Sequence, residues 1–399
     1  MEKSYMPLSD VRKTMSVKWY RCPIESSTLR KLSRRSDLQG WFQAGGHLTL
    51  FIFTASLAYY FWDVKNWLGF VIMLFVHGTI GNFFSGVAPH ELGHGTVFKT
   101  KWLNKFFMYF FSLLSWWNPF DYASSHTYHH RYTQYADGDR ENLFPLDPHL
   151  GPIFLLQIFT LNLFSKPGRT FGKGGLLSTI YLTFRSSLWL VGSIEIPSQE
   201  WLQALHEDQP TEHRKSMWWS RLQLIFHGSV LVYSIWIGQW ALPFLINFFA
   251  FTANWLGFFV GMTQHCGLRE DVSDFRKCVR SIKLNPFVSF LYWRMNWHTE
   301  HHMYAGVPCY NLKKLSQAIA HDMPEPRTLI GAWREMREIR RQQKNNPNYQ
   351  FDTPLPACAN TTPIDNTDEL ASSIGELAPE GLRSVSYTHL RAHETRHDL

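Results

Sequence analysis

The chain has 399 residues, a formal net charge of +7 and a high aromatic content of 16%, which includes 31 Phe and 17 Trp. A chain of this length holds either two soluble domains or one polytopic membrane domain. The mean hydropathy of −0.21 averages apolar blocks with charged segments, so it does not decide between the two. The five cysteines contain no C-x-x-C pair, which excludes a disulfide-stapled scaffold and a rubredoxin-like centre and favours a reducing, cytosolic setting.

Residues 1–44 form a basic arm that lacks the short apolar core of a cleaved signal peptide. Two apolar stretches follow, residues 45–62 and 67–88, joined by a very short connection. A helix needs about 20 apolar residues to cross the hydrocarbon core, and tilt or bilayer thinning accommodates a shorter one. This pair therefore predicts a transmembrane helical hairpin.

The middle of the chain has three further apolar patches, each broken or flanked by charges, prolines or glycines: residues 106–120, 153–164 and 176–191. They are predicted to be interfacial or buried helices on the cytosolic side. A second apolar pair, residues 222–238 and 240–262, then predicts a second hairpin.

The C-terminal part of the chain begins with residues 327–344, "RTLIGAWREMREIRRQQK", which predict a cytosolic amphipathic helix. This helix either docks an acidic electron carrier or lies on anionic lipid, and the sequence slightly favours lipid. The membrane domain is thus predicted to cover residues 45–344. Residues 345–383 are polar and predicted to be disordered. Residues 384–399 resemble a translated sequencing adapter and are excluded from function.

Basic residues are distributed unevenly around the two hairpins. The hairpin tips, residues 63–66 and 238–239, contain one basic residue, Lys65, whereas the N-terminal arm contains Lys3, Arg12, Lys13, Lys18, Arg21, Arg30, Lys31, Arg34 and Arg35. Because cytosolic loops collect Lys and Arg, both termini and the middle segment are predicted to be cytosolic. The predicted fold is all-α: a multi-pass membrane protein with four transmembrane helices in two hairpins and a cytosolic helical cap. The charge asymmetry argues against the alternative, a large soluble helical core.

Eight of the 19 histidines fall into three boxes, His90-Glu91-Leu92-Gly93-His94, His126-Thr127-Tyr128-His129-His130 and His298-Thr299-Glu300-His301-His302. Residues three and four apart share a helix face. Eight convergent imidazoles would repel if charged and would be costly to bury unpaired, whereas metal coordination removes both problems. The predicted topology places all three boxes on the cytosolic face. Lone histidines in apolar stretches, such as His77 and His227, are interpreted as packing residues.

The three boxes, in this order between helical hairpins, resemble those of the membrane fatty acid desaturase and hydroxylase superfamily. The flanks "HELGHGTVFKTKWLN", "SHTYHHRYTQYADGDRE" and "NWHTEHHMYAGVPCYNLKKL" resemble bacterial members, and the resemblance covers about residues 40–336. It implies two iron ions, a catalytic role for the eight box histidines, and a location in the bacterial inner membrane. A ninth ligand is implied between the last span and the third box, where this chain has His265. Some members carry Asn at the position of Gly261.

The nine expected metal ligands are therefore His90, His94, His126, His129, His130, His265, His298, His301 and His302. Asp137, Asp139 and Glu141 are either carboxylates that orient imidazole N–H groups or ordinary surface charges. The resemblance implies an O2-dependent reaction that removes two vicinal hydrogens from a fatty acyl chain or related lipid and forms a double bond. A hydroxylase or alkene-forming oxidase on the same scaffold is the alternative.

Each turnover requires two external electrons, and the sequence has no G-x-G-x-x-G, C-x-x-C or H-P-G-G motif for a fused carrier. A separate ferredoxin-, rubredoxin- or cytochrome-type donor is therefore implied, and no nucleic-acid partner is expected.

Two competing hypotheses remain. The first box is also an H-E-x-x-H zinc-protease motif with Glu91 as general base, which would need a distal Asp, and the only Asp-Gly pair is Asp137-Gly138. The other is a non-catalytic membrane protein that binds lipid or metal. A second H-E-x-x-H, residues 393–397 with His389 at helical spacing, lies in the adapter-like end and has no apolar face.

Overall fold

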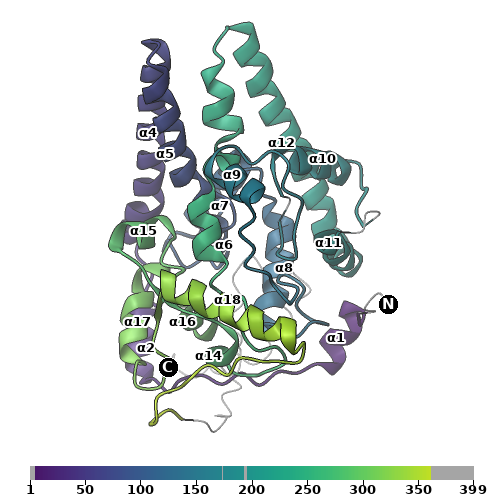
Figure 1. The fold of residues 1–399 in the computed structure, drawn as a ribbon, viewed down its shortest axis with the longest axis vertical. Coiled ribbons are helices and arrows are strands. Elements are labelled where there is room, and N and C mark those ends of the chain that lie inside the picture. Colours follow the sequence, from purple (N-terminus) through teal and green to yellow (C-terminus); the bar gives the residue numbers. More distant parts are fainter. Residues whose placement is uncertain (1–4, 173, 193–195, 361–399) are drawn as a thin grey trace, which may run out of the picture.

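The computed structural model describes residues 5–172, 174–192 and 196–360 of the chain. The described residues are mostly helical, and two helical hairpins project from one end of a helical cap (Figure 1). This agrees with the predicted all-α class. The one departure is a short parallel pair of strands, β1 (Ile282–Lys283) and β2 (Arg327–Thr328), in which Ile282 pairs with Arg327.

The first hairpin consists of a π-helical turn, two long helices and their continuation: η1 (Trp41–Gly45), α4 (Gly46–Asp63), α5 (Trp67–Gly81), η2 (Asn82–Phe84) and α6 (Val87–Gly93). At its tip the Asn66 side chain caps α5 by accepting a hydrogen bond from Gly69 N at 3.0 Å. Of the described residues, the helical segment Trp67–Gly93 is the one that is long and apolar enough to cross a membrane.

The second hairpin consists of one long helix and an interrupted return: α12 (Pro210–Trp236), η3 (Pro243–Asn247), η4 (Phe249–Phe251) and α13 (Trp255–Gly261). The sequence predicts a continuous helix over residues 240–262, but the structure breaks it. Pro243 has no backbone N–H, and further along Asn162 N donates to Phe251 O at 2.8 Å while Ala253 N donates to Thr160 O at 2.7 Å. Non-helical backbone is tolerated here because its polar groups are paired within the protein.

The three apolar patches of the middle segment each contain one helix, α7 (Lys101–Leu114), α9 (Pro152–Phe159) and α10 (Leu176–Ser187). The middle segment also contains α8 (Pro119–Tyr132) and α11 (Pro197–Asp208). The rest of the cap is built from α1 (Leu8–Thr14), α2 (Ser26–Leu32), α3 (Asp37–Gly40), α14 (Phe275–Cys278), α15 (Pro286–Leu291), α16 (His298–Met303), η5 (Cys309–Asn311), α17 (Leu312–Ala318) and α18 (Leu329–Asn345).

The N-terminal arm crosses the cap and is held by contacts far away in sequence. The Trp19 ring stacks on Phe275 with 4.0 Å between centroids, and the Tyr20 hydroxyl donates to Asp322. Residues 346–360 were expected to begin a disordered tail, yet they lie along the cap: Lys277 Nζ donates to Thr353 O at 2.8 Å and forms an ion pair with Asp352. The remainder of the predicted tail, and the adapter-like end, lie outside the described residues.

Candidate metal centre

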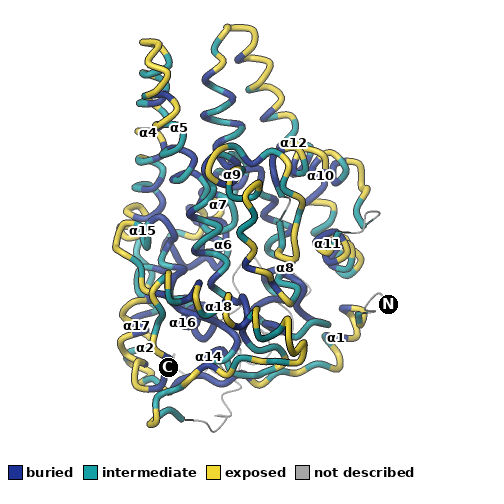
Figure 2. Tube along the Cα trace, viewed as in Figure 1, coloured by how far each residue is buried: buried dark blue, intermediate teal, exposed yellow. Residues whose placement is uncertain are grey.

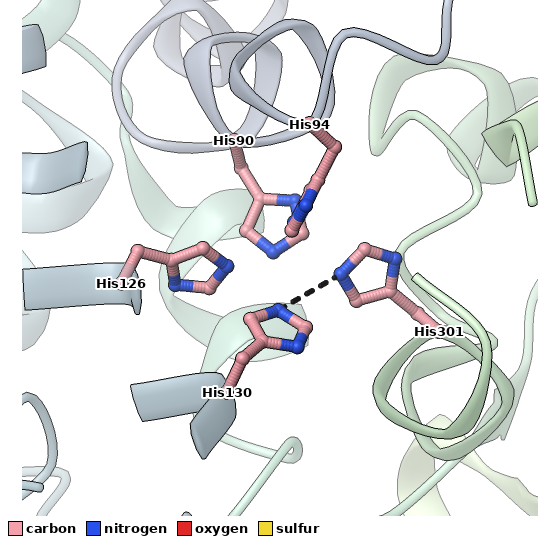
Figure 3. A group of neighbouring side chains, drawn as sticks. All are labelled: His90, His94, His126, His130 and His301. Atoms are coloured by element: carbon pink, nitrogen blue, oxygen red, sulfur yellow. Dashed lines mark hydrogen bonds between the residues drawn. The ribbon is translucent and has the colours of Figure 1, made fainter. Parts of the chain in front are cut away.

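The structure brings all nine predicted histidines together in the cap, although they come from four separate stretches of the chain. Their nitrogen atoms form two sets, and within each set these atoms lie within 4.8 Å of one another. The five-histidine set contains His90, His94, His126, His130 and His301 (Figure 3). The four-histidine set contains His129, His265, His298 and His302. All nine residues are buried.

The first box lies on α6, and both of its histidines join the five-histidine set. Gly86, directly before α6, has φ +78°, a left-handed conformation that glycine adopts without strain. This residue lies in the short connection between η2 and α6. The imidazoles of His90 and His94 then lie one helical turn apart, with ring centroids separated by 4.9 Å.

The second box lies on α8, whose start is fixed by Asn118 and Pro119. The Asn118 side chain accepts from the backbone N–H groups of the first turn, and Pro119 occupies the first helical position. Four residues apart, His126 and His130 point into the five-histidine set, whereas His129 points into the four-histidine set.

The third box lies on α16 and is divided in the reverse sense: His298 and His302 join the four-histidine set, and His301 joins the five-histidine set. Two hydrogen bonds anchor α16 to the strand region before it. Thr299 N donates to Ser281 Oγ at 3.0 Å, and Thr299 Oγ1 donates to Val279 O at 3.1 Å. Both H-x-x-H-H boxes therefore supply nitrogen atoms to both sets.

The two sets are directly adjacent. The imidazole of His130, in one set, stacks on that of His302, in the other, with 4.4 Å between centroids. His301 Nε2 lies 3.2 Å from His130 Nε2, so the third box is in contact with the second. The arrangement is compatible with two metal ions at neighbouring positions.

Buried acceptors fix the orientation of several imidazoles through Nδ1. Glu91 lies 3.0 Å from His90 Nδ1, Glu141 lies 3.1 Å from His126 Nδ1, and Asp139 lies 2.9 Å from His129 Nδ1. The Cys278 carbonyl lies 3.2 Å from His265 Nδ1. An acceptor at Nδ1 holds the proton there, so the Nε2 lone pair of each of these rings faces the centre.

Of the three carboxylates singled out in the sequence, Asp139 and Glu141 contact imidazoles. Asp137 does not reach a histidine and accepts a hydrogen bond from Met6 N at 3.1 Å. Sequence reasoning considered Glu91 only as a protease base, and it missed three further partners of imidazole Nδ1 atoms: Thr133, Gln134 and Gln264. Glu91 could have been found from its position beside His90, but no sequence signal marks the other three.

The protonation of the site follows from its burial. Burial, followed by the proximity of other imidazoles, lowers the pKa of His126, His130, His298, His301 and His302 well below 6.5. Burial also lowers the pKa of His265 to about 3. For His129, burial opposes protonation, but Asp139 and Glu141 outweigh it and raise the pKa. Most of these rings are therefore neutral at pH 7, which is the form that binds metal.

The residues fit a pair of divalent cations. The buried Nε2 atoms of His90, His94 and His126 have no hydrogen-bond partner among the described residues. His298 Nε2 lies 3.0 Å from His265 Nε2 and 3.2 Å from His302 Nε2, although one proton can satisfy only one such contact. Convergent lone pairs repel unless a cation lies between them. The buried carboxylates Glu91, Asp139 and Glu141 offset positive charge at the same place.

Replacing the carboxylate that orients His129 should weaken metal binding. In an Asp139→Asn variant the amide no longer provides a negatively charged acceptor for His129 Nδ1, and we expect iron affinity to fall about 10- to 100-fold. Chelator competition on the purified protein measures this. Asp137→Asn is the matched control and should change the affinity less than about twofold, because Asp137 contacts no imidazole. Equal losses in both variants would contradict the orienting role of Asp139.

Comparison with known proteins agrees with this geometry. The fatty acid desaturase family model matches residues 65–333, a segment that contains all three histidine boxes and His265. A search of the curated proteins finds no match for the chain. Members of the matched family are membrane-associated, iron-dependent oxidoreductases of lipid metabolism. The match spans well over half of the chain, and the chain therefore belongs to the fatty acid desaturase family.

Proposed function

We propose that this protein is an O2-dependent di-iron desaturase that introduces a double bond into a fatty acyl chain or related lipid. The observation that supports this most directly is the pair of adjacent, buried histidine sets, which together use every histidine of the three boxes and His265. A zinc protease would use only the first box and a distal Asp. In this chain Glu91 contacts His90 and lies 3.5 Å from His301 Nδ1, so its carboxylate is engaged between two imidazoles.

The proposed site binds one iron ion in each histidine set. Iron held there would supply the activation of O2 that an unactivated C–H bond requires. In the balanced reaction, two substrate hydrogens, two external electrons and two protons reduce O2 to two waters while the double bond forms. Burial keeps most of the imidazoles neutral and away from bulk water. The carboxylates of Glu91, Glu141 and Asp139 orient one imidazole each.

An aromatic wall beside the centre supports an apolar substrate. The Tyr122 ring stacks on His126 with centroids 5.0 Å apart, and it contacts Trp117 at 5.2 Å and Phe171 at 6.2 Å. Trp117 and Phe171 also line a cavity of about 200 Å³ between the cap and the hairpins. The rest of its lining is mixed and includes the polar side chains of Asn82, Asn118, Asp121 and Gln199. We propose that part of the lipid occupies this cavity and that the acyl chain reaches the five-histidine set past Tyr122.

Four membrane spans in two hairpins are proposed for the same chain. Exposed residues run along both hairpins (Figure 2). They include large apolar side chains: Ile52 is 55% exposed, Val71 61%, Ile225 65% and Val232 67%. Exposed apolar surface of this extent indicates contact with lipid or a partner rather than water. With the hairpin tips on the far side of the bilayer, the metal centre and both termini lie on the cytosolic side.

Lipid profiling of a host that expresses the protein tests the proposed function. We expect a new monounsaturated species with the wild-type chain and none with a His301→Ala variant produced at the same level. A new hydroxylated species would instead support the hydroxylase alternative. If purified protein contains one zinc ion and cleaves peptides, the desaturase proposal is wrong.

Removal of the adapter-like end should leave the enzyme intact. A chain truncated after Arg383 lacks residues 384–399, including the second H-E-x-x-H. We expect product yield within about twofold of the full chain, because the sequence of this segment resembles a translated adapter and offers no apolar face. The lipid profile of the same host measures this. A loss of product at equal protein level would assign a function to this segment.

A further inference from the structure

The basic helix α18 has two faces with different roles. Its apolar residues Ala332, Trp333, Met336 and Ile339 are buried. Trp333 and Met336 pack in a cluster with Leu146, Cys266, Phe259 and Met262, and Trp333 Nε1 donates to Phe259 O at 2.9 Å. A helix that binds a bilayer surface needs a free apolar face to insert. In α18 this face is used inside the protein, which disfavours the lipid interpretation that the sequence slightly favours.

The position of α18 leads to the same conclusion. The helix crosses the part of the cap remote from the hairpin tips (Figure 1). Its outer face carries the exposed side chains Arg334, Arg337, Arg341 and Lys344, which recur every three or four residues and so share one side of the helix. Arg341 is paired with Glu338 at 2.7 Å, whereas Arg334 and Arg337 form no ion pair with any residue in the described part of the chain. The outer face is therefore a positively charged surface on the side of α18 opposite the residues that are buried in the cap.

Contacts of α18 connect it to the turn that carries His265, a member of the four-histidine set. Arg280 forms an ion pair with Glu335 of α18 at 2.9 Å, and its NH1 donates to Thr263 O at 2.7 Å and to Cys266 O at 3.1 Å. These contacts tie α18 to the turn that carries His265. Gly267 lies so close to α18 that an added Cβ would be 3.1 Å from Ile339. The helix α18 thus lies between its own basic outer face and the turn that carries His265, a predicted metal ligand.

An open cleft beside α18 also leads to this set. The cleft has a volume of about 740 Å³, and His265, Gln264 and Arg340 line it together with the basic side chains Lys166 and Arg169. Gln264 Nε2 lies 3.4 Å from His298 Nδ1, so a second member of the four-histidine set is one contact away. Between the two sets, the four-histidine set is the one whose residues line this opening.

We propose that the outer face of α18 and the rim of this cleft dock a small acidic electron-carrier protein, and that electrons enter the centre through the four-histidine set. The inference rests on the proposed function, which needs two electrons per turnover. Each reduced carrier loses one electron, so two carriers dock in succession. Opposite charges accelerate such encounters and make them sensitive to salt.

The test uses the purified, iron-loaded full chain and reduced plant-type ferredoxin, an acidic one-electron carrier, as the probe. Binding is measured by microscale thermophoresis at 50 and 300 mM NaCl, and reoxidation of ferredoxin by stopped flow. An Arg334→Glu/Arg337→Glu double variant should bind at least about tenfold more weakly at low salt, and wild-type binding should weaken about tenfold between the two salt concentrations. Lys313→Glu/Lys314→Glu, an equal charge change at exposed positions of α17, is the matched control and should bind like wild type.

The possible outcomes separate the docking proposal from the proposed function. Turnover driven by dithionite should be the same in all three proteins, and its absence in all three would reject the proposed function while the binding result still stands. The docking proposal is wrong if wild-type protein does not bind ferredoxin at 50 mM NaCl, or if both double variants lose binding equally. It is also wrong if the α18 variant loses binding to vesicles containing 30% phosphatidylserine and keeps its affinity for ferredoxin.

Discussion

A His301→Ala variant should lose more than about a hundredfold in turnover, because residues that merely orient metal ligands already contribute 10- to 100-fold. His301 is fully buried, its Nε2 lies 3.2 Å from His130 Nε2, and its ring lies 4.5 Å from that of His90. Removing this imidazole takes one of the five nitrogen donors out of the five-histidine set. Metal analysis and lipid profiling measure the two consequences: iron content should fall from about two per chain in the wild type, and the unsaturated product should disappear.

The control for this variant is His149→Ala, which removes an exposed histidine outside both sets. It should retain wild-type iron content and product yield. A His301→Ala protein that folds, binds the full complement of iron and remains active would show that His301 is not a ligand. Comparing the thermal unfolding of the two variants in detergent separates a local loss of metal from general misfolding.

An Asp322→Ala variant should destabilise the protein by about 3 kcal/mol, since breaking a buried ion pair leaves an uncompensated charge. Asp322 and Arg276 are both 1% exposed and lie 2.9 Å apart. Asp322 also accepts from the Tyr20 hydroxyl and from Asn360 N, so it joins the N-terminal arm, α14 and residues 346–360. Arg276 keeps Asp274 as a second partner at 2.8 Å, which limits the loss.

The matched control is Tyr20→Phe, which removes one hydrogen bond to Asp322 and should cost about 1 kcal/mol. Reversible chemical unfolding in detergent micelles gives both values. Because α14 also carries Cys278, whose carbonyl orients His265, the Asp322→Ala variant should bind iron less tightly as well. A smaller loss for Asp322→Ala than for Tyr20→Phe would mean that the ion pair does not stabilise the cap.

The sequence predicts which histidines meet but not how they divide. Spacing of three and four residues places His126, His129 and His130 on broadly one side of α8. Which of the two histidine sets each residue joins depends on the smaller angles between them. Successive residues are 100° apart on a helix, so His126 and His130 differ by only about 40°, whereas His129 lies about 60° to the other side of His126. The two sets lie on different sides of α8. Their positions depend on how α6, α16 and the turn that carries His265 pack around this helix.

The secondary structure was predictable where its signal is local. Apolar length marks the hairpins. The start of α8 was not predicted, although Asn118-Pro119, which lies within the apolar patch at residues 106–120, is a local signal for it. The interruption between Pro243 and α13 was not predictable beyond the proline, because it depends on backbone pairing between Phe251 and Asn162. Likewise, the polar composition of residues 346–360 resembles a disordered tail, and nothing local indicates that Lys277 pairs with Asp352.

The way in which two boxes straddle the two histidine sets has a consequence for how the centre is assembled. α8 places two imidazoles in one set and one in the other, and α16 does the reverse. We expect from this arrangement that a metal ion bound in the five-histidine set fixes the rotation of both helices and thereby positions three of the four donors of the four-histidine set. An ion bound first in the four-histidine set should likewise position three of the five donors of the other set. If the two proposed ions bind, the first should lower the ordering cost of the second, and we expect cooperative loading. At limiting iron, most molecules should then be either empty or doubly filled.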